Sequence, residues 1–187
     1  MKEISLNILD IAENSVRAGA KNIRIALTEL DGTLTIVIED DGCGMDREML
    51  ARVENPFTTT RTTRSVGLGI PLYKLAAEQT GGSVAIRSVS EKDDPVRHGT
   101  TVTAVFHTGH IDCMPLGDII STICTLIQGA PQIDFCFTHA LNGQEVKLDT
   151  KEMRAVLGDD IPIDSFEVMD WIRKSLEEQY TEIENNH

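Results

Sequence analysis

Apolar side chains recur with two different periods along the first 107 residues of the chain. Over residues 4–16 they fall at three- and four-residue intervals, which predicts an amphipathic helix. Residues 22–30 and 33–39 are rich in β-branched side chains and are joined by Asp31-Gly32, which is a strong hairpin signal. The further elements expected in this part are helices over 46–53 and 68–80 and strands over 83–89 and 100–107.

The pattern starts again beyond residue 107. The elements expected there are a helix over 115–128, strands over 132–138 and 144–148, and two short helices. The last helix carries Phe166 and Trp171, and we expect both aromatic side chains to anchor the core. The polar and acidic residues 177–187 are expected to fray.

The composition is that of a globular protein, and its charge is strongly acidic. Of the 187 residues, 41% are hydrophobic and 25% are charged, and the net charge is −13. This excess of negative charge argues against binding to a nucleic-acid backbone or to an anionic membrane. Only five of the 17 basic residues follow Phe106, against half of the 30 acidic ones. We therefore expect a first domain over residues 1–107 and an acidic α+β extension over residues 108–187.

The cysteines give no sign of an oxidising compartment. Four cysteines lie far apart without a C-x-x-C pair, and the first residues contain no uninterrupted apolar stretch with a cleavage site. We therefore expect a cytoplasmic protein with free thiols. His107, His110 and Cys113 leave a metal site open, but their spacing fits no standard zinc or iron–sulfur pattern. The alternative is a strand-to-helix junction.

Two polar side chains on the first predicted helix can share a ligand. Asp10 and Asn14 are four residues apart, so they lie one turn apart on the same helix face. A carboxylate and an amide there can hold a hydrated Mg²⁺, which accepts few protein oxygens and leaves positions for phosphate and water. The alternative is a polar stripe that faces solvent.

The second predicted strand runs into the sequence D-D-G-C-G at residues 40–44. The Asp40 carboxylate at a strand end can accept a hydrogen bond from an exocyclic amine. Gly42 and Gly44 let the backbone approach a ligand closely. The alternative is an ordinary loop, in which such glycine turns also occur.

A second glycine motif opens the helix predicted over 68–80. Gly67 and Gly69 leave backbone N–H groups accessible at a helix N-terminus, which suits a phosphate. The motif is not a P-loop, because G-x-x-x-x-G-K-[ST] is absent. It is not a dinucleotide-binding fingerprint either, because these glycines lie far from the first strand.

The order and spacing of these segments resemble the GHKL family, the ATP-binding domains of gyrase, heat-shock chaperone, histidine kinase and MutL type. The resemblance covers roughly residues 3–107. Residues 10–20 are similar to the N box, 40–44 to the G1 box and 67–72 to the G2 box, and residues 55–61 are similar to the F-box segment of some sensor kinases. Together, matches in this order make the resemblance specific.

The resemblance implies a set of contacts with ATP and Mg²⁺. It implies that Asn14 coordinates the Mg²⁺ that bridges the ATP phosphates, and that Asp40 binds the adenine amine. Gly42 and Gly44 then shape the adenine pocket. The other implied contacts are backbone binding of phosphates by Gly67, Leu68 and Gly69, neutralisation of phosphate charge by Arg61, and a position near adenine for Thr100.

The fold implied by the resemblance is an α/β two-layer sandwich with helices on one face of a mixed, mostly antiparallel sheet. A small α+β extension follows it. Only nine residues precede Asp10, so we expect a stand-alone ATP-binding protein without a dimerisation or phosphoacceptor domain. Its oligomeric state stays open.

The residues and the resemblance leave three functions open. The first is phosphoryl transfer to a partner protein, or nucleotide-controlled binding of one, as the similarity to sensor kinases and anti-sigma kinases implies. The second is slow ATP hydrolysis with Asp10 as the base that activates water. The hydrolysing relatives have a glutamate at this position, and the shorter aspartate predicts a reduced rate. The third is a non-catalytic module that ATP switches between two states.

Overall fold

The computed structural model describes residues 3–54, 69–141, 143–158 and 160–185. The elements are α1 (Ile4–Arg17), β1 (Asn22–Leu30), β2 (Thr33–Asp40), α2 (Arg47–Glu54), α3 (Gly69–Gln79), β3 (Ser83–Val89), β4 (Gly99–His107), α4 (Ile119–Gly129), β5 (Asp134–Leu141), β6 (Gln144–Asp149), α5 (Thr150–Leu157) and α6 (Phe166–Asn185). No helix in these described ranges is long and apolar enough to cross a membrane.

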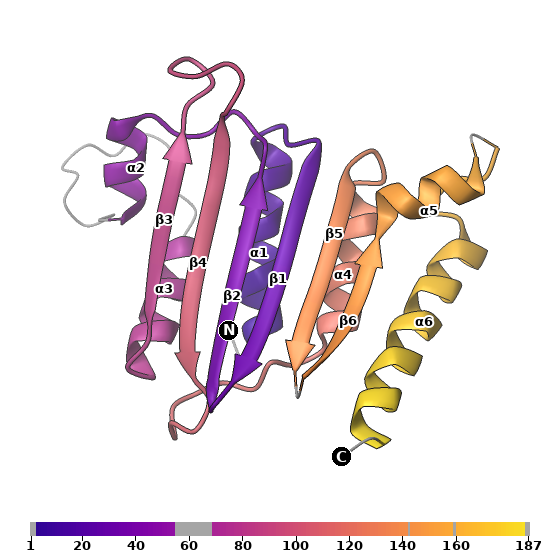
Figure 1. The fold of residues 1–187 in the computed structure, drawn as a ribbon. Helices are drawn as coiled ribbons and strands as arrows, with labels where there is room; N and C mark the ends of the chain where they lie inside the picture. The colour runs from indigo at the N-terminus through magenta and orange to yellow at the C-terminus, as the bar shows by residue number, and fades with distance from the viewer. Residues whose placement is uncertain (1–2, 55–68, 142, 159, 186–187) are drawn as a thin grey trace.

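The strands of the described residues form one six-stranded sheet in the order β3-β4-β2-β1-β5-β6. Neighbouring strands are antiparallel except β1 and β5, which run parallel. Helices α1, α3 and α4 lie behind the strands in Figure 1 and cover one face of the sheet, while α6 packs against α4 and β6. This arrangement confirms the α/β two-layer sandwich with a mixed and mostly antiparallel sheet.

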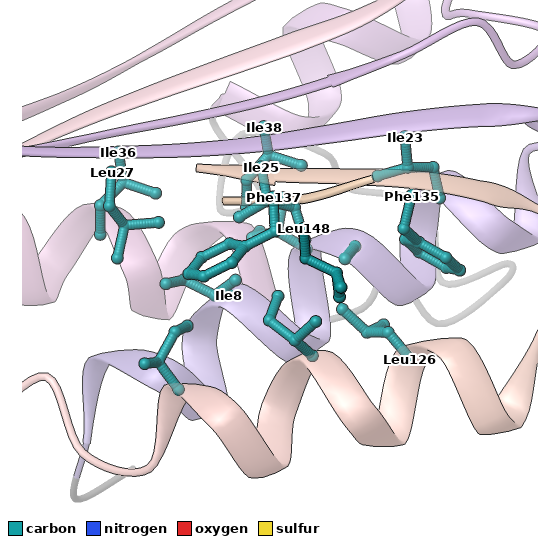
Figure 2. Packing of buried hydrophobic residues seen from close by; sticks show 14 of the residues in the cluster. Ile8, Ile23, Ile25, Leu27, Ile36, Ile38, Leu126, Phe135, Phe137 and Leu148 are labelled. Carbon is teal, nitrogen blue, oxygen red and sulfur yellow. The ribbon is translucent and has the colours of Figure 1, made fainter. Parts of the chain in front are cut away.

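Alternating burial along each strand places the core between the sheet and the helices. In β1 the side chains of Ile23, Ile25 and Leu27 are buried, and the residues between them face the other side of the sheet. Figure 2 shows Ile8 of α1 and Leu126 of α4 on the side to which these strand residues point. The buried side chains of both halves of the chain belong to one hydrophobic cluster.

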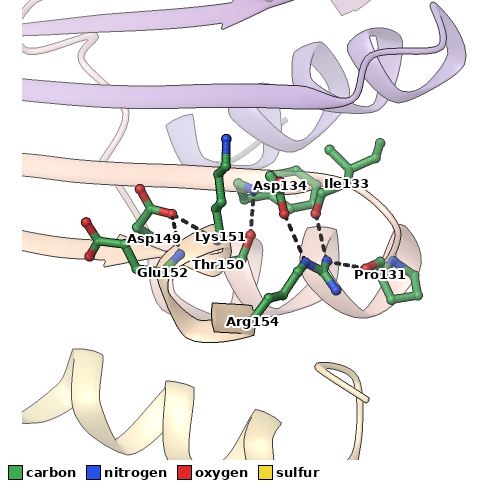
Figure 3. Close-up of polar contacts among 9 residues, drawn as sticks. Pro131, Ile133, Asp134, Asp149, Thr150, Lys151, Glu152 and Arg154 are labelled. Atoms are coloured by element: carbon green, nitrogen blue, oxygen red, sulfur yellow. Dashed lines mark hydrogen bonds and ion pairs between the residues drawn. The ribbon is translucent and has the colours of Figure 1, made fainter. Parts of the chain in front are cut away.

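The segment beyond β4 extends the sheet of the first part. Strand β5 lies alongside β1, with Asn22 opposite Asp134, and β6 returns antiparallel at the edge. Polar contacts tie the start of α5 to the start of β5 (Figure 3). Thr150 Oγ1 accepts a hydrogen bond from the backbone N–H of Phe135 at 2.7 Å, and Arg154 Nε donates to Asp134 Oδ1 at 2.9 Å. The sheet is therefore continuous across residue 107, and the division into two domains stays a prediction.

Helix α4 begins at Ile119, four residues later than the sequence predicts. Gly117 just before it has a φ of +78°, which a continuing helix does not allow. Asp118 caps the helix, because its Oδ1 accepts a hydrogen bond from the backbone N–H of Ser121 at 2.8 Å. The glycine and the cap together set this boundary.

Helix α6 continues to Asn185, through the polar segment that we expect to fray. It does so because Ile183 is buried and Tyr180 packs against the core. Phe166 and Trp171 are not core anchors, since they are 81% and 56% exposed. The buried stripe of the helix comprises instead Val168, Ile172, Leu176 and Ile183.

His139 of β5 fastens α6 to the sheet. Its Nδ1 lies 2.8 Å from the Tyr180 hydroxyl, and its Nε2 lies 3.1 Å from Glu29 Oε1 on β1. Burial disfavours the imidazolium more than Glu29 favours it, so the pKa of His139 is below its ordinary value. Burial also raises the pKa of Tyr180. A neutral ring can therefore accept from the protonated hydroxyl and donate to the carboxylate.

Candidate functional site

A cavity of about 660 Å³ opens between α1, α2, the loop over residues 41–46 and the ends of β2 and β4. Pockets of this size are typical of small-molecule sites. Among the described residues, its charged lining consists of Asp40, Asp46, Glu48, Arg17 and Arg52. Two arginines do not outweigh three carboxylates, so a strongly anionic ligand needs a bound cation or further basic residues here.

The fold brings together predicted site residues that lie far apart in the sequence. Those that line the cavity are Asn14 of α1, Asp40 at the end of β2, Gly44 of the following loop and Thr100 of β4. Those that fall outside the described residues are Arg61, Gly67 and Leu68. The remaining three, Asp10, Gly42 and Gly69, lie beside the cavity.

Asp40 is the best defined polar group of the cavity. It is the last residue of β2, and it is 9% exposed. Its Oδ2 accepts a hydrogen bond from Ser15 Oγ at 2.6 Å, and its Oδ1 accepts one from the backbone N–H of Gly42 at 2.9 Å. An ionised carboxylate offers about four acceptor positions. Each oxygen of Asp40 therefore keeps capacity for a donor that a ligand brings.

The adjacent carboxylate, Asp41, has a structural role. It is absent from the cavity lining, and it accepts hydrogen bonds from the Asn22 side chain at 2.7 Å and from the backbone N–H groups of Asn22 and Lys21 at 2.9 and 2.7 Å. Partial burial on its own raises the pKa of Asp41, but these hydrogen bonds outweigh it and hold the pKa below its ordinary value. The ionised Asp41 thus fixes the loop to the start of β1.

The two glycines of this loop pack against neighbouring elements. A Cβ on Gly42 would lie 2.9 Å from the Cβ of Ala18. Gly44 has a φ of +63°, and a Cβ there would lie 1.8 Å from the Val89 carbonyl oxygen. A side chain at either position would push the loop away from α1 or β3.

Polar residues of α1 lie at two different sites, the cavity and the start of α3. Asn14 and Arg17 line the cavity, and Arg17 Nη1 donates to Asn14 Oδ1 at 3.3 Å while its Nη2 donates to Glu13 Oε2 at 2.8 Å. Asp10 is absent from the lining. It lies against the start of α3, where a Cβ on Gly69 would be 3.5 Å from the Asp10 Cβ.

Three side chains that contact the site carry no motif in the sequence. Ser15, which binds Asp40, follows Asn14 in α1 but resembles any serine of an amphipathic helix. Ser88 Oγ of β3 lies 2.8 Å from Thr100 Oγ1, and His98 Nδ1 lies 2.6 Å from the carbonyl oxygen of Gly42. For Ser88 and His98, the only feature in the sequence that could have indicated a role is the predicted pairing of β3 with β4. The sequence does not show that this pair lies beside the glycine-containing loop over residues 41–46.

The described ranges hold no group of three or more His, Cys, Asp or Glu side chains arranged for a metal ion. Near the end of β4, the backbone N–H of Cys113 donates to the His110 carbonyl oxygen at 2.9 Å. The His110 ring accepts from the backbone N–H of Asp112 at 3.2 Å. These contacts are those of a turn between a strand and a helix.

The family of the chain follows from a comparison with known protein families. A family model described as histidine kinase-, DNA gyrase B- and HSP90-like ATPase matches residues 2–110. The chain belongs to the GHKL ATPase family. The matched range of this GHKL domain runs from α1 just past the end of β4, and it includes every residue that the sequence analysis assigned to the site.

Curated relatives of the GHKL domain include sensor kinases. It is 34% identical to sporulation kinase D of Bacillus subtilis (strain 168) over 103 residues, which are 55% of this chain and 19% of that kinase. It is 33% identical to the signal transduction histidine-protein kinase AtoS of Escherichia coli (strain K12) over 90 residues, 48% of this chain and 14% of that one. The chain thus matches about a fifth or less of the length of these relatives.

Among solved structures, the Aquifex aeolicus MutL ATPase domain complexed with ADP has a similar fold. The TM-score is 0.53 at 14% sequence identity, and the match covers 84% of this chain and 69% of that one. At this identity the likeness concerns the fold alone. It extends beyond the part of the chain that the family model matches.

Proposed function

We propose that this GHKL domain binds ATP with Mg²⁺ in the 660 Å³ cavity, and that the nucleotide either serves phosphoryl transfer to a partner protein or controls the binding of one. The observation that carries the proposal is the Asp40 carboxylate. It borders the cavity, and each of its oxygens has one donor within the protein and room for another. A ligand with an exocyclic amine, such as adenine, supplies that donor.

The proposed contacts with the rest of the nucleotide follow the elements around Asp40. Thr100 and Asn14 both line the cavity; Thr100 borders the adenine, and the Asn14 amide oxygen coordinates Mg²⁺. Gly67, Leu68 and Gly69 offer backbone N–H groups to the phosphates, and Arg61 adds positive charge. The excess of carboxylates in the described lining supports a need for the cation.

The curated relatives favour phosphoryl transfer or signalling as the use of that nucleotide. Both relatives described above are kinases by name. Because the matched segment is a small part of each of them, the partner protein, the phosphoacceptor and the transfer itself are proposals for this chain. A cytoplasmic location belongs to the same proposal.

A second candidate function is slow ATP hydrolysis. The observation that favours it is the position of Asp10, which lies against Gly69 at the start of α3, where the phosphates are proposed to bind. A carboxylate there can orient or activate a water molecule for attack on the terminal phosphate. The aspartate side chain is shorter than the glutamate of the hydrolysing relatives, which predicts a low rate.

Calorimetric titration of the purified protein with ADP and with ATP, in the presence and absence of Mg²⁺, tests the proposal. We expect Asn14→Ala to abolish the Mg²⁺-dependent part of the affinity, whereas Gln128→Ala, an exposed change on α4, leaves it unaltered. Wild-type protein that releases no heat with either nucleotide would overturn the proposal. Mg²⁺ dependence retained in Asn14→Ala would overturn the assignment of Asn14.

Alkylation of Cys43 tells whether the nucleotide occupies this cavity. Cys43 is exposed and lines the cavity, whereas burial raises the pKa of the Cys113, Cys124 and Cys136 thiols. We expect ADP to slow the alkylation of Cys43, as read by mass spectrometry. An unchanged rate at saturating ADP would assign binding to another site.

Incubation with γ-labelled ATP separates the uses of the nucleotide. Labelled partner protein indicates phosphoryl transfer, free phosphate indicates hydrolysis, and unchanged bound ATP indicates a nucleotide-controlled binding module. Asp10→Asn is expected to reduce the release of phosphate strongly under hydrolysis and to leave nucleotide affinity nearly unchanged.

A further inference from the structure

The β3–β4 hairpin holds four successive residues of the glycine loop, residues 42–45. The Gly42 carbonyl oxygen lies 2.6 Å from His98 Nδ1, and the Cys43 carbonyl oxygen accepts from the backbone N–H of Glu91 at 2.9 Å. Gly44 packs so closely on Val89 that no side chain fits between them. The backbone N–H of Met45 donates to Ser88 Oγ at 2.8 Å.

Within this set, the His98 side chain contacts Gly42, the loop residue that also donates a hydrogen bond to Asp40. Gly42 donates its N–H to Asp40 Oδ1 and offers its carbonyl oxygen to His98. The N–H group of Gly42 is therefore bound to the Asp40 carboxylate, which lines the cavity. Its carbonyl oxygen is bound to the His98 imidazole, which does not line the cavity. A shift of Gly42 would remove one of the two internal donors that orient Asp40.

The chemistry of the contact fixes the state of the ring. A carbonyl oxygen only accepts hydrogen bonds, so Nδ1 of His98 must carry a proton. The neutral ring is therefore the Nδ1–H tautomer, which is the less common one in free imidazole side chains. The protonated ring carries the same donor at Nδ1, so the contact persists in both charge states.

We propose that His98 is a positioning residue for nucleotide binding: by donating from Nδ1 to the Gly42 carbonyl oxygen it holds the loop so that Asp40 faces the adenine amine. The inference rests on the proposed binding of ATP and adds a residue that acts through the loop and touches no ligand. It also predicts that the position of one nitrogen atom matters more than ring volume.

Substitution of His98 by Asn or by Gln distinguishes two requirements. One is a hydrogen-bond donor at the position of Nδ1, and the other is a donor anywhere on the side chain. The Asn Nδ2 atom lies as many bonds from Cα as His Nδ1 does, whereas the Gln Nε2 atom corresponds to His Nε2. We expect His98→Ala and His98→Gln to weaken ADP binding by about three- to tenfold, the value of one hydrogen bond. His98→Asn is expected to bind ADP within about twofold of wild type, and exposed His110→Ala serves as the control.

The tautomer of His98 can be read from the wild-type protein without any variant. Long-range ¹H–¹⁵N correlation spectra at a pH where the ring is neutral are expected to assign the proton to Nδ1. A ring that only fills space would follow the usual preference for Nε2–H. An Nε2–H ring in the neutral state would overturn the inference even if every variant failed to fold.

The titrations distinguish the failure of this inference from that of the proposed function. If wild-type protein binds ADP and His98→Ala binds it equally well, the positioning role is wrong and the proposed function stands. Equal weakening in His98→Asn and His98→Ala also overturns the positioning role. If wild-type protein does not bind ADP, the proposed function fails and this inference fails with it.

Discussion

Neighbouring residues of one motif do different work in this protein, and the difference comes from their partners. Asp40 borders the cavity and is oriented by Ser15 and Gly42, whereas Asp41 is held by backbone and side-chain donors at the start of β1. The motif predicts that Asp40 faces a ligand. It does not predict Ser15, because one serine on an amphipathic helix has no distinguishing pattern and its role depends on how α1 packs on β2.

Ser15→Ala tests the internal support of Asp40. The change removes a hydrogen bond of 2.6 Å to a buried carboxylate, and such bonds to charged groups contribute about 1.5–3 kcal/mol. We expect the free energy of unfolding to fall by about that amount and ADP affinity to fall as well. Urea unfolding and calorimetry measure the two effects.

Ser5→Ala is the matched control for that change. Ser5 is a buried serine on the same helix, but it lies outside the cavity lining and its hydroxyl donates to Glu3. Its loss is expected to leave ADP affinity as in wild type. If Ser15→Ala also binds ADP as wild type does, the link between this hydroxyl and Asp40 has no role in recognition.

Gly44→Ala separates backbone strain from steric overlap. Gly44 and Gly32 have similar φ values, +63° and +72°, but a Cβ on Gly44 overlaps the Val89 carbonyl oxygen while one on Gly32 meets nothing within 4 Å. Gly32→Ala is expected to cost only the strain of the left-handed conformation, about 1–2 kcal/mol. Gly44→Ala must cost more, as thermal unfolding of the two variants will measure, and equal losses would contradict the overlap.

At the scale of elements, the spacing of hydrophobic residues predicted most helices and strands. Where it misplaced the end of an element, a glycine or a side-chain cap sets the observed boundary. The hairpin of β1 and β2 follows from Asp31-Gly32, and α2 begins after Asp46, whose Oδ1 accepts from the backbone N–H of Met49. The length of α6 could not be predicted in the same way. Its last turns are polar in composition, and they are helical because Tyr180 reaches His139 on a strand far away in the sequence.

The contact between α6 and the sheet predicts a dependence of stability on pH. Burial, opposed by Glu29, lowers the pKa of His139 in the folded state below the value of 6.5 that it has when exposed. The unfolded chain then binds more protons below that pH, so His139 contributes its full stability above pH 6.5 and loses it as the pH falls. The slope for one proton is at most about 1.4 kcal/mol per pH unit.

His139→Gln is expected to flatten this part of the profile. Urea unfolding at intervals between about pH 7.5 and 5.5 measures the slope. Most carboxyl groups titrate below this pH range, so they contribute little to it. Exposed His110→Gln provides the control and is expected to keep the wild-type slope. An equal slope in wild type and His139→Gln would mean that the buried ring does not carry the effect.

At the scale of the whole molecule, one sheet and one hydrophobic cluster include both halves of the chain. The sequence predicted the layers through the family resemblance, but not the neighbour of β1 in the second half. Strand β5 pairs with β1, although the two strands lie far apart in the sequence, with Asn22 opposite Asp134. No local sequence pattern specifies such a long-range partner. The change of charge near residue 107 is a surface property and does not interrupt the core.

The shared core predicts that both halves unfold together. Trp171 is the single tryptophan and reports on α6, while amide exchange in β2 reports on the first half. We expect the two probes to report coincident unfolding transitions. Phe137→Ala removes a ring that is 1% exposed. With either probe, this change is expected to lower the free energy of unfolding by about 3–5 kcal/mol. Separate transitions would instead support two independent domains divided near residue 107.

The parallel pairing of β1 with β5 also affects how the chain is made. During synthesis on a ribosome, β1 is translated long before β5, whose first residue to pair with it is Asp134, opposite Asn22. Until then β1 has one unpaired edge, which can recruit strands from other nascent chains. The strand that closes this edge belongs to the half of the chain with few basic residues and a larger net negative charge. The β1 edge therefore needs protection from aggregation until β5 has been translated.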